Sequence, residues 1–115
     1  MDLHRLITKI IVPPYVKVMN DNIIYKPMVG FRKKIPIESI QTIQIRTTDS
    51  GPLFEDFFLV IETKSKVIRI AQETEGFGEL LSELQKLSDF DNEAVIKAAS
   101  CVENAVFNVW QRKKP

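Results

Sequence analysis

The hydrophobic period changes in the middle of Val67-Ile-Arg-Ile-Ala-Gln-Glu-Thr-Glu-Gly-Phe-Gly-Glu-Leu-Leu-Ser-Glu-Leu-Gln-Lys-Leu87. The first part alternates, with Ile68 and Ile70 on one face, which is typical of a strand buried on one side. The second part has the spacing of one helix face, through Phe77, Leu80, Leu81, Leu84 and Leu87. We therefore expect strands before this point and helices after it, with Thr74 as the N-cap of the first helix.

The upstream residues read as strands separated by turns. The expected strands cover residues 15–19, 23–25, 31–37, 42–48, 57–61 and 67–71. The cluster Asn20-Asp21-Asn22 predicts a hairpin turn, because Asn and Asp tolerate the left-handed backbone. Residues 36–40 predict a short turn or 3₁₀ segment. Residues 57–61 are continuously apolar, which indicates a central strand covered on both faces.

The downstream residues add a second helix and a last element. The helix is expected to begin near Asp91 or Asn92, with an apolar stripe of Val95, Ala98, Ala99 and Val102. Residues 105–112 are rich in β-formers and predict a final strand, the alternative being a frayed helix end. The fold class is thus α+β, a strongly bent antiparallel sheet of six or seven strands with two C-terminal helices. The expected core comprises Phe58, Val60, Ile68, Ile70, Leu80, Leu84 and Val95.

Length and composition limit the possible functions. The chain has 115 residues, which predicts one domain over residues 1–115. Sixteen basic and 15 acidic residues give a net charge of +1, lower than expected of a nucleic-acid binder. Cys101 is the only cysteine, so no intramolecular disulfide can form. The start lacks the pattern of a signal peptide, and we expect a soluble cytoplasmic protein.

Charge is segregated along the chain. Residues 1–46 carry eight Lys/Arg and three Asp/Glu, whereas residues 73–103 carry two Lys and eight Asp/Glu. Two interpretations stay open: the acidic helices present only a solvated face, or this face docks a basic protein partner through residues such as Glu79 and Glu83.

The loop over residues 47–56 is the second acidic candidate. Its carboxylates Asp49, Glu55 and Asp56 could bind a cation or a basic partner. The alternative is an ordinary turn in which Asp49 caps its own backbone, Gly51 takes the unusual dihedral angle and Pro52 stiffens the chain.

A basic segment lies beside Phe31. Lys26, Arg32, Lys33 and Lys34 could meet an anionic lipid headgroup or a phosphate. The alternative is an edge strand whose lysines prevent aggregation.

No catalytic or cofactor motif is present. His4 is the only histidine and is far in sequence from Cys101. The acidic run 89–93 lacks the glycine that a calcium loop needs at its sixth position, and Gly76-Phe-Gly78 lacks the third glycine of a dinucleotide site. We expect no cofactor, no metal and no catalytic residue; a small enzyme using the carboxylates of the 47–56 loop is the third hypothesis.

The run Phe31-Arg-Lys-Lys-Ile-Pro-Ile-Glu-Ser-Ile-Gln-Thr-Ile-Gln-Ile45 resembles the bacterial pleckstrin-homology-like pattern, in which a strand leads into an I-P-x-x-x-I-x-x-I turn and another strand. The resemblance covers residues 15–87 and makes residues 88–115 a C-terminal extension. The whole chain also resembles a group of small uncharacterised bacterial proteins, through Thr47-Thr-Asp-x-Gly-Pro52 with Glu55-Asp56, Phe90-Asp-Asn-Glu-Ala-Val-Ile96, and Asn104-Ala-x-Phe107 with Trp110.

These resemblances imply a bacterial protein without known catalytic activity, and by analogy of size they suggest a toxin-neutralising immunity protein. Our first hypothesis is therefore a non-enzymatic protein-interaction module with an unidentified, basic protein partner. The alternative is binding of anionic lipid or phosphate through the basic segment 26–34, which would make a membrane surface the partner.

Overall fold

The structure, a computed structural model, describes residues 13–49 and 56–113. These residues form seven strands, a 3₁₀ turn and two helices. In chain order they are β1 (Tyr15–Met19), β2 (Asn22–Lys26), β3 (Lys33–Pro36), η1 (Ile37–Ser39), β4 (Ile40–Thr47), β5 (Phe57–Thr63), β6 (Val67–Ala71), α2 (Phe77–Leu84), α3 (Asn92–Ala99) and β7 (Ala105–Gln111). Neither of the helices in the described ranges is long and apolar enough to cross a membrane.

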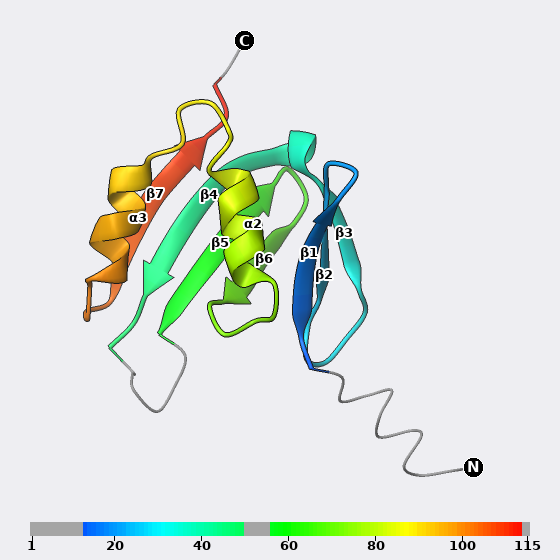
Figure 1. The fold of residues 1–115 in the computed structure, drawn as a ribbon, viewed down its shortest axis with the longest axis horizontal. Coiled ribbons are helices and arrows are strands. Elements are labelled where there is room, and N and C mark those ends of the chain that lie inside the picture. The colour runs from blue at the N-terminus through cyan, green and yellow to red at the C-terminus, as the bar shows by residue number, and fades with distance from the viewer. Residues whose placement is uncertain (1–12, 50–55, 114–115) are drawn as a thin grey trace.

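The strands form two antiparallel sheets, and the two helices come after the first six strands (Figure 1). The small sheet has the order β1-β2-β3, and the large sheet has the order β6-β5-β4-β7. The α+β class and the strand number are confirmed, but the expectation of one continuous sheet is wrong. The sheets separate at η1, where Pro36 lacks a backbone donor and a 3₁₀ turn interrupts the extended chain between β3 and β4.

The β1–β2 hairpin follows directly from its turn residues. Asn20 and Asp21 have φ angles of 52° and 61°, and Met19 pairs with Asn22 across the turn. A two-residue loop with two positive φ angles matches the twist of the flanking strands. The predicted hairpin is confirmed, and its register fixes which side chains of the small sheet point outward.

One hydrophobic core joins both sheets and both helices. In Figure 1 the helices lie in front of the large sheet, α2 contacts β1 of the small sheet, and α3 lies beside β7. Of the predicted core, the five buried members are Val60, Ile68, Ile70, Leu80 and Leu84. Phe58 and Val95 are only half-buried, so these two predictions are wrong. Phe58 alternates with the buried Leu59, and its ring is covered by the guanidinium of Arg69, 3.9 Å from the ring centroid.

The helix boundaries differ from the predicted ones in two places. The N-cap of α2 is Gly76 in the left-handed conformation, whereas Thr74 is buried and its carbonyl accepts a hydrogen bond from the Phe77 amide. The helix ends at Leu84, so Leu87 packs on the core from the following turn. The Thr74 cap and the longer helix were therefore wrong.

The second helix begins as expected. The Asp91 carboxylate accepts a hydrogen bond from the Ala94 amide at 3.0 Å, which confirms a start at this position. The apolar stripe was wrong at its end, because α3 stops at Ala99, which is exposed, and Val102 lies beyond it with 78% of its surface exposed. The strand over residues 105–112 is confirmed by β7, and no frayed helix replaces it.

Candidate functional site

The small sheet has an apolar inner face and a basic outer face. Val16, Ile23 and Ile35 are buried, and successive side chains of a strand point to opposite faces. The register aligns Lys17, Ile24 and Lys34 in one row across β1, β2 and β3, on the face opposite to the buried residues. We use the name basic face for this outer surface and its continuation at the strand ends, made by Lys17, Lys26, Arg32 and Lys34. Lys33 pairs with Tyr25 and alternates with Lys34, so it lies on the opposite face at the start of β3.

A shallow groove of about 250 Å³ crosses the basic face. It is lined by the cations Lys17, Arg32 and Lys34, the polar residues Asn20 and Asn22, and the apolar side chains of Met19 and Ile24. No carboxylate lines this groove, and its three cations form no ion pair within residues 13–49 and 56–113. Ammonium, guanidinium and amide donors around one depression suit a phosphate-bearing anion.

The structure brings together two of the four predicted basic residues in this groove. Arg32 and Lys34 line it, Lys33 is exposed at the start of β3, and the Lys26 ammonium donates to the Pro27 carbonyl at 2.8 Å. Sequence reasoning missed Lys17, which comes from the neighbouring hairpin strand. The alternation of side-chain direction along Tyr15–Met19 could have identified Lys17, because it follows the buried Val16 and so points to the outer face.

The connection between β2 and β3 extends the basic face with apolar side chains. Met28, Val29 and Phe31 expose 56%, 70% and 91% of their surface. Phe31 had been expected inside a strand, but β3 begins only at Lys33. This part of the prediction was wrong, because Gly30 has a φ angle of 113° and keeps the chain in a turn at this point.

The acidic loop candidates are only partly described. Glu55 lies outside the described residues. Asp49 is exposed and Asp56 half-buried, and the loop ends meet where the Thr48 amide donates to the Asp56 carbonyl at 2.9 Å. Within the described ranges, no group of three or more His, Cys, Asp or Glu side chains is placed to hold a metal ion.

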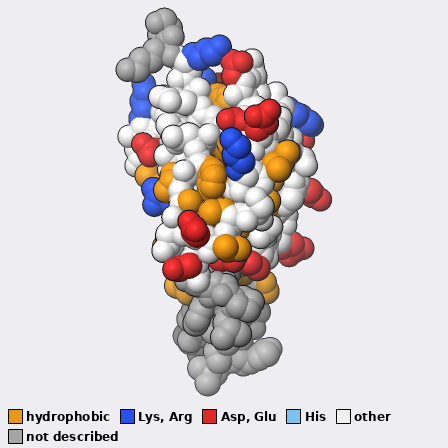
Figure 2. All heavy atoms as spheres, turned by 90° about the vertical axis from the view of Figure 1, so that its left-hand side faces the viewer, with side chains coloured by type: hydrophobic (Ala, Val, Ile, Leu, Met, Phe, Trp, Pro, Cys, Tyr) orange, Lys and Arg blue, Asp and Glu red, His pale blue; other side chains and the backbone are white. Residues whose placement is uncertain are grey.

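The acidic helix candidates are interspersed with cations. Glu79 is exposed on α2, whereas Glu83 forms an ion pair with Lys86 at 2.9 Å. The Asp89 carboxylate accepts a hydrogen bond from Lys113 and raises the pKa of that ammonium above 10.5. Figure 2 shows the side of the molecule that carries α3 and β7, where acidic, basic and hydrophobic side chains alternate instead of forming one continuous acidic area.

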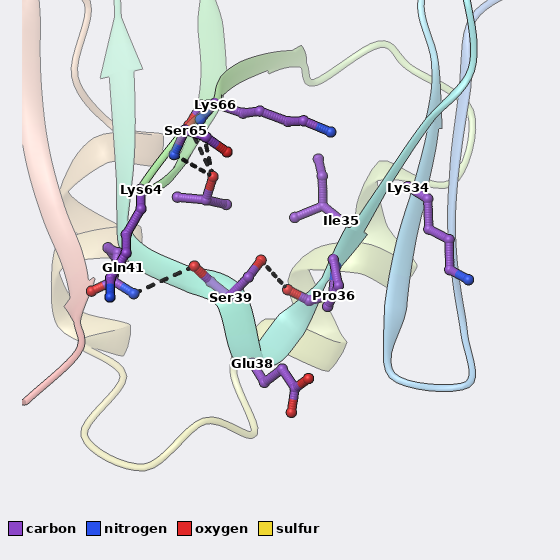
Figure 3. Close-up of a pocket in the computed structure, with 10 residues that line it drawn as sticks. Lys34, Ile35, Pro36, Glu38, Ser39, Gln41, Lys64, Ser65 and Lys66 are labelled. Atoms are coloured by element: carbon purple, nitrogen blue, oxygen red, sulfur yellow. Dashed lines mark hydrogen bonds between the residues drawn. The ribbon is translucent and has the colours of Figure 1, made fainter.

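A second lysine-bearing cavity, of about 390 Å³, lies between η1 and the β5–β6 turn (Figure 3). Lys34, Lys64 and Lys66 line it, but Figure 3 shows Lys34 pointing away from it. Two of its hydroxyl groups are engaged internally: Ser39 donates to the Pro36 carbonyl at 2.7 Å, and Thr63 accepts from the Lys66 amide at 3.0 Å. Glu38 also lines this cavity, and Figure 3 shows its carboxylate pointing away from it, as Lys34 does.

The remaining candidates, His4 and Cys101, are not brought together by anything described. His4 lies outside the described residues, and Cys101 is half-buried with its sulfur 3.5 Å from the hydroxyl oxygen of Thr47. Comparison of the chain with models of protein families, with curated proteins and with solved structures found no match in any of the three.

Proposed function

We propose that this protein binds anionic membrane surfaces peripherally, through the basic face of the small sheet. One observation carries the proposal: a groove lined by three cations and two asparagines, with no carboxylate in its lining. The exposed apolar side chains Met28, Val29 and Phe31 lie in the connection between Lys26 and Arg32, two cations of the basic face. A basic surface with adjoining apolar side chains is the combination that interfacial membrane binding uses.

The expected affinity is modest. Each Lys or Arg near an anionic leaflet contributes about 1 kcal/mol. The four cations of the basic face would then contribute on the order of 4 kcal/mol, which corresponds to a dissociation constant of about 1 mM before any apolar contribution. Binding of this strength is reversible and should depend strongly on salt, because the Debye length is about 10 Å at 0.1 M.

The test is sedimentation with vesicles of phosphatidylcholine containing about 30% phosphatidylserine, the composition that supplies the anionic surface potential. The wild type should sediment at low salt, and Arg32→Glu with Lys34→Glu, which reverses two of the cations that line the groove, should abolish sedimentation. The matched control is Lys86→Glu with Lys97→Glu, which makes the same charge change on the helical side of the molecule. Equal loss in both double variants would refute a role of the basic face and leave only a net-charge effect.

A soluble phosphate ester offers the same anion without a surface. Glycerophosphoserine at the same headgroup concentration is therefore the second arm of the experiment. Binding to vesicles without measurable binding of this compound supports a membrane surface as the partner. Equal affinity for the two would assign the groove to a soluble phosphate ligand instead.

A second candidate function, docking of a basic protein on the acidic helical side, is favoured by the apolar residues exposed there. Ile96 and Val102 expose 70% and 78% of their surface near the exposed Glu93 and Glu103. Exposed apolar residues rimmed by charge are common at protein interfaces. Pull-downs from the source cell with Glu93→Lys plus Glu103→Lys should lose salt-sensitive partners; recovery of the same partners at the same yield would refute this candidate.

A further inference from the structure

The β2–β3 connection concentrates exposed apolar surface at one end of the small sheet. Met28, Val29 and Phe31 fall within four residues, and Phe31 has the largest exposed fraction among the exposed large hydrophobic residues of the described chain. Single exposed hydrophobic residues are ordinary on a protein surface, whereas several adjoining ones mark an interaction site. Packing within the fold therefore does not explain why these three apolar side chains are exposed.

The loop is constrained at its base and open at its tip. The Lys26 ammonium donates to the Pro27 carbonyl at 2.8 Å, and Pro27 fixes its own φ angle. Gly30 has a φ angle of 113°, and a side chain built there would find only Pro27 within 4 Å, at 3.7 Å. The space around the tip is thus free, and the turn is set by a residue that tolerates this backbone conformation.

Charge is polarised along the small sheet. No carboxylate occurs between Asp21 and Glu38, and Lys26, Arg32, Lys33 and Lys34 flank the apolar tip on both sides. Because Asn22 pairs with Pro36, Asp21 and Glu38 lie at the end of the β2–β3 pair opposite to the loop. The tip end of the β2–β3 pair therefore combines apolar side chains with flanking cations, while Glu75 and Glu79 lie beside β1, where they line a depression together with Lys17.

This combination matches one partner in particular. An anionic bilayer presents phosphates at its surface and acyl chains directly beneath them, so cations meet the former while apolar side chains enter the latter. We propose that the β2–β3 loop is a membrane-inserting wedge, in which Met28, Val29 and Phe31 enter the acyl boundary of an anionic leaflet and the flanking cations contact lipid phosphates. This inference rests on the proposed function, because insertion requires that the basic face meets a membrane.

The first experiment locates the tip by fluorescence. Phe31→Trp is mixed with phosphatidylcholine–phosphatidylserine vesicles whose phosphatidylcholine acyl chains are brominated, since bromine quenches only fluorophores that reach the acyl region. The wild type, with Trp110 alone, measures the background, and Val67→Trp places the same probe at another exposed site, 61% exposed on β6. We expect quenching and a blue-shifted emission for Phe31→Trp and neither change for the two controls.

The second experiment measures the contribution of the tip to binding. Phe31→Ser should raise the dissociation constant for the same vesicles about ten- to a hundredfold, as expected when a large apolar side chain no longer leaves water. Val67→Ser, a truncation of the same kind away from the loop, should leave it unchanged. Both positions are exposed, so neither variant is expected to disturb folding.

The outcomes separate the wedge from the broader proposal. Vesicle binding by Phe31→Trp without quenching, or unchanged affinity in Phe31→Ser, would overturn insertion while leaving electrostatic binding of the basic face intact. Absence of any vesicle binding by the wild type would overturn both. If Phe31→Ser keeps its affinity for vesicles and the protein binds an isolated protein partner, the loop would be assigned to a pocket of that partner instead.

Discussion

Gly76 lies so close to Val16 that a side chain there would collide with the backbone. A methyl group built on Gly76 would come within 1.9 Å of the Val16 carbonyl oxygen, and the φ angle of Gly76 is 90°. The Val16 amide also donates to the Glu75 carbonyl at 2.8 Å, next to an isolated parallel bridge between Tyr15 and Glu75. The start of α2 is thereby held against β1 by backbone contact, and β1 is an edge strand of the small sheet that carries the basic face.

Gly76→Ala should therefore lower the free energy of unfolding by about 2 kcal/mol or more, from the positive φ angle and the displaced Val16 backbone. Gly78→Ala is the matched control, because nothing lies within 4 Å of the added methyl and the residue is helical. That control should raise stability by up to about 1 kcal/mol. Urea denaturation measures both, and equal effects of the two substitutions would contradict the described contact.

Leu84 tests the assignment of the helix face. It is fully buried at the end of α2, so Leu84→Ala should cost about 2–5 kcal/mol through lost burial and a residual cavity. Ile96→Ala removes a side chain that is 70% exposed and should change stability by less than about 0.5 kcal/mol. Thermal melts in which Leu84→Ala unfolds at the same temperature as the wild type would disprove the packing of α2.

Asp91 tests the start of α3. Its carboxylate accepts the Ala94 amide, so Asp91→Ala should cost about 1 kcal/mol. Asp91→Asn keeps an oxygen acceptor at the cap position and should cost much less. If chemical denaturation gives the same loss for both, the effect comes from the charge near the helix start and not from the capping hydrogen bond.

The elements with a clear local period could be predicted from sequence. The turn at Asn20 and Asp21, the alternation at Ile43 and Ile45, and the cap at Asp91 are each determined by neighbouring residues. The Gly76 cap could not be predicted, because it depends on the approach of Val16 from a distant strand.

The same distinction holds for the candidate site. The basic segment 26–34 is visible as a charge run, but the groove needs Lys17 from β1, which only the strand register places in one row with Ile24 and Lys34. Phe31 was predicted to begin a strand over residues 31–37. Gly30 instead keeps this residue in the turn, where it reaches water.

The most direct measurement is the binding of the wild-type protein to vesicles of increasing phosphatidylserine content at low salt. The account predicts no binding to pure phosphatidylcholine, a bound fraction that rises steeply with phosphatidylserine, and a loss of binding as salt is raised beyond about 0.15 M. Absence of binding at every phosphatidylserine content would contradict it. So would binding that is the same with and without the anionic lipid.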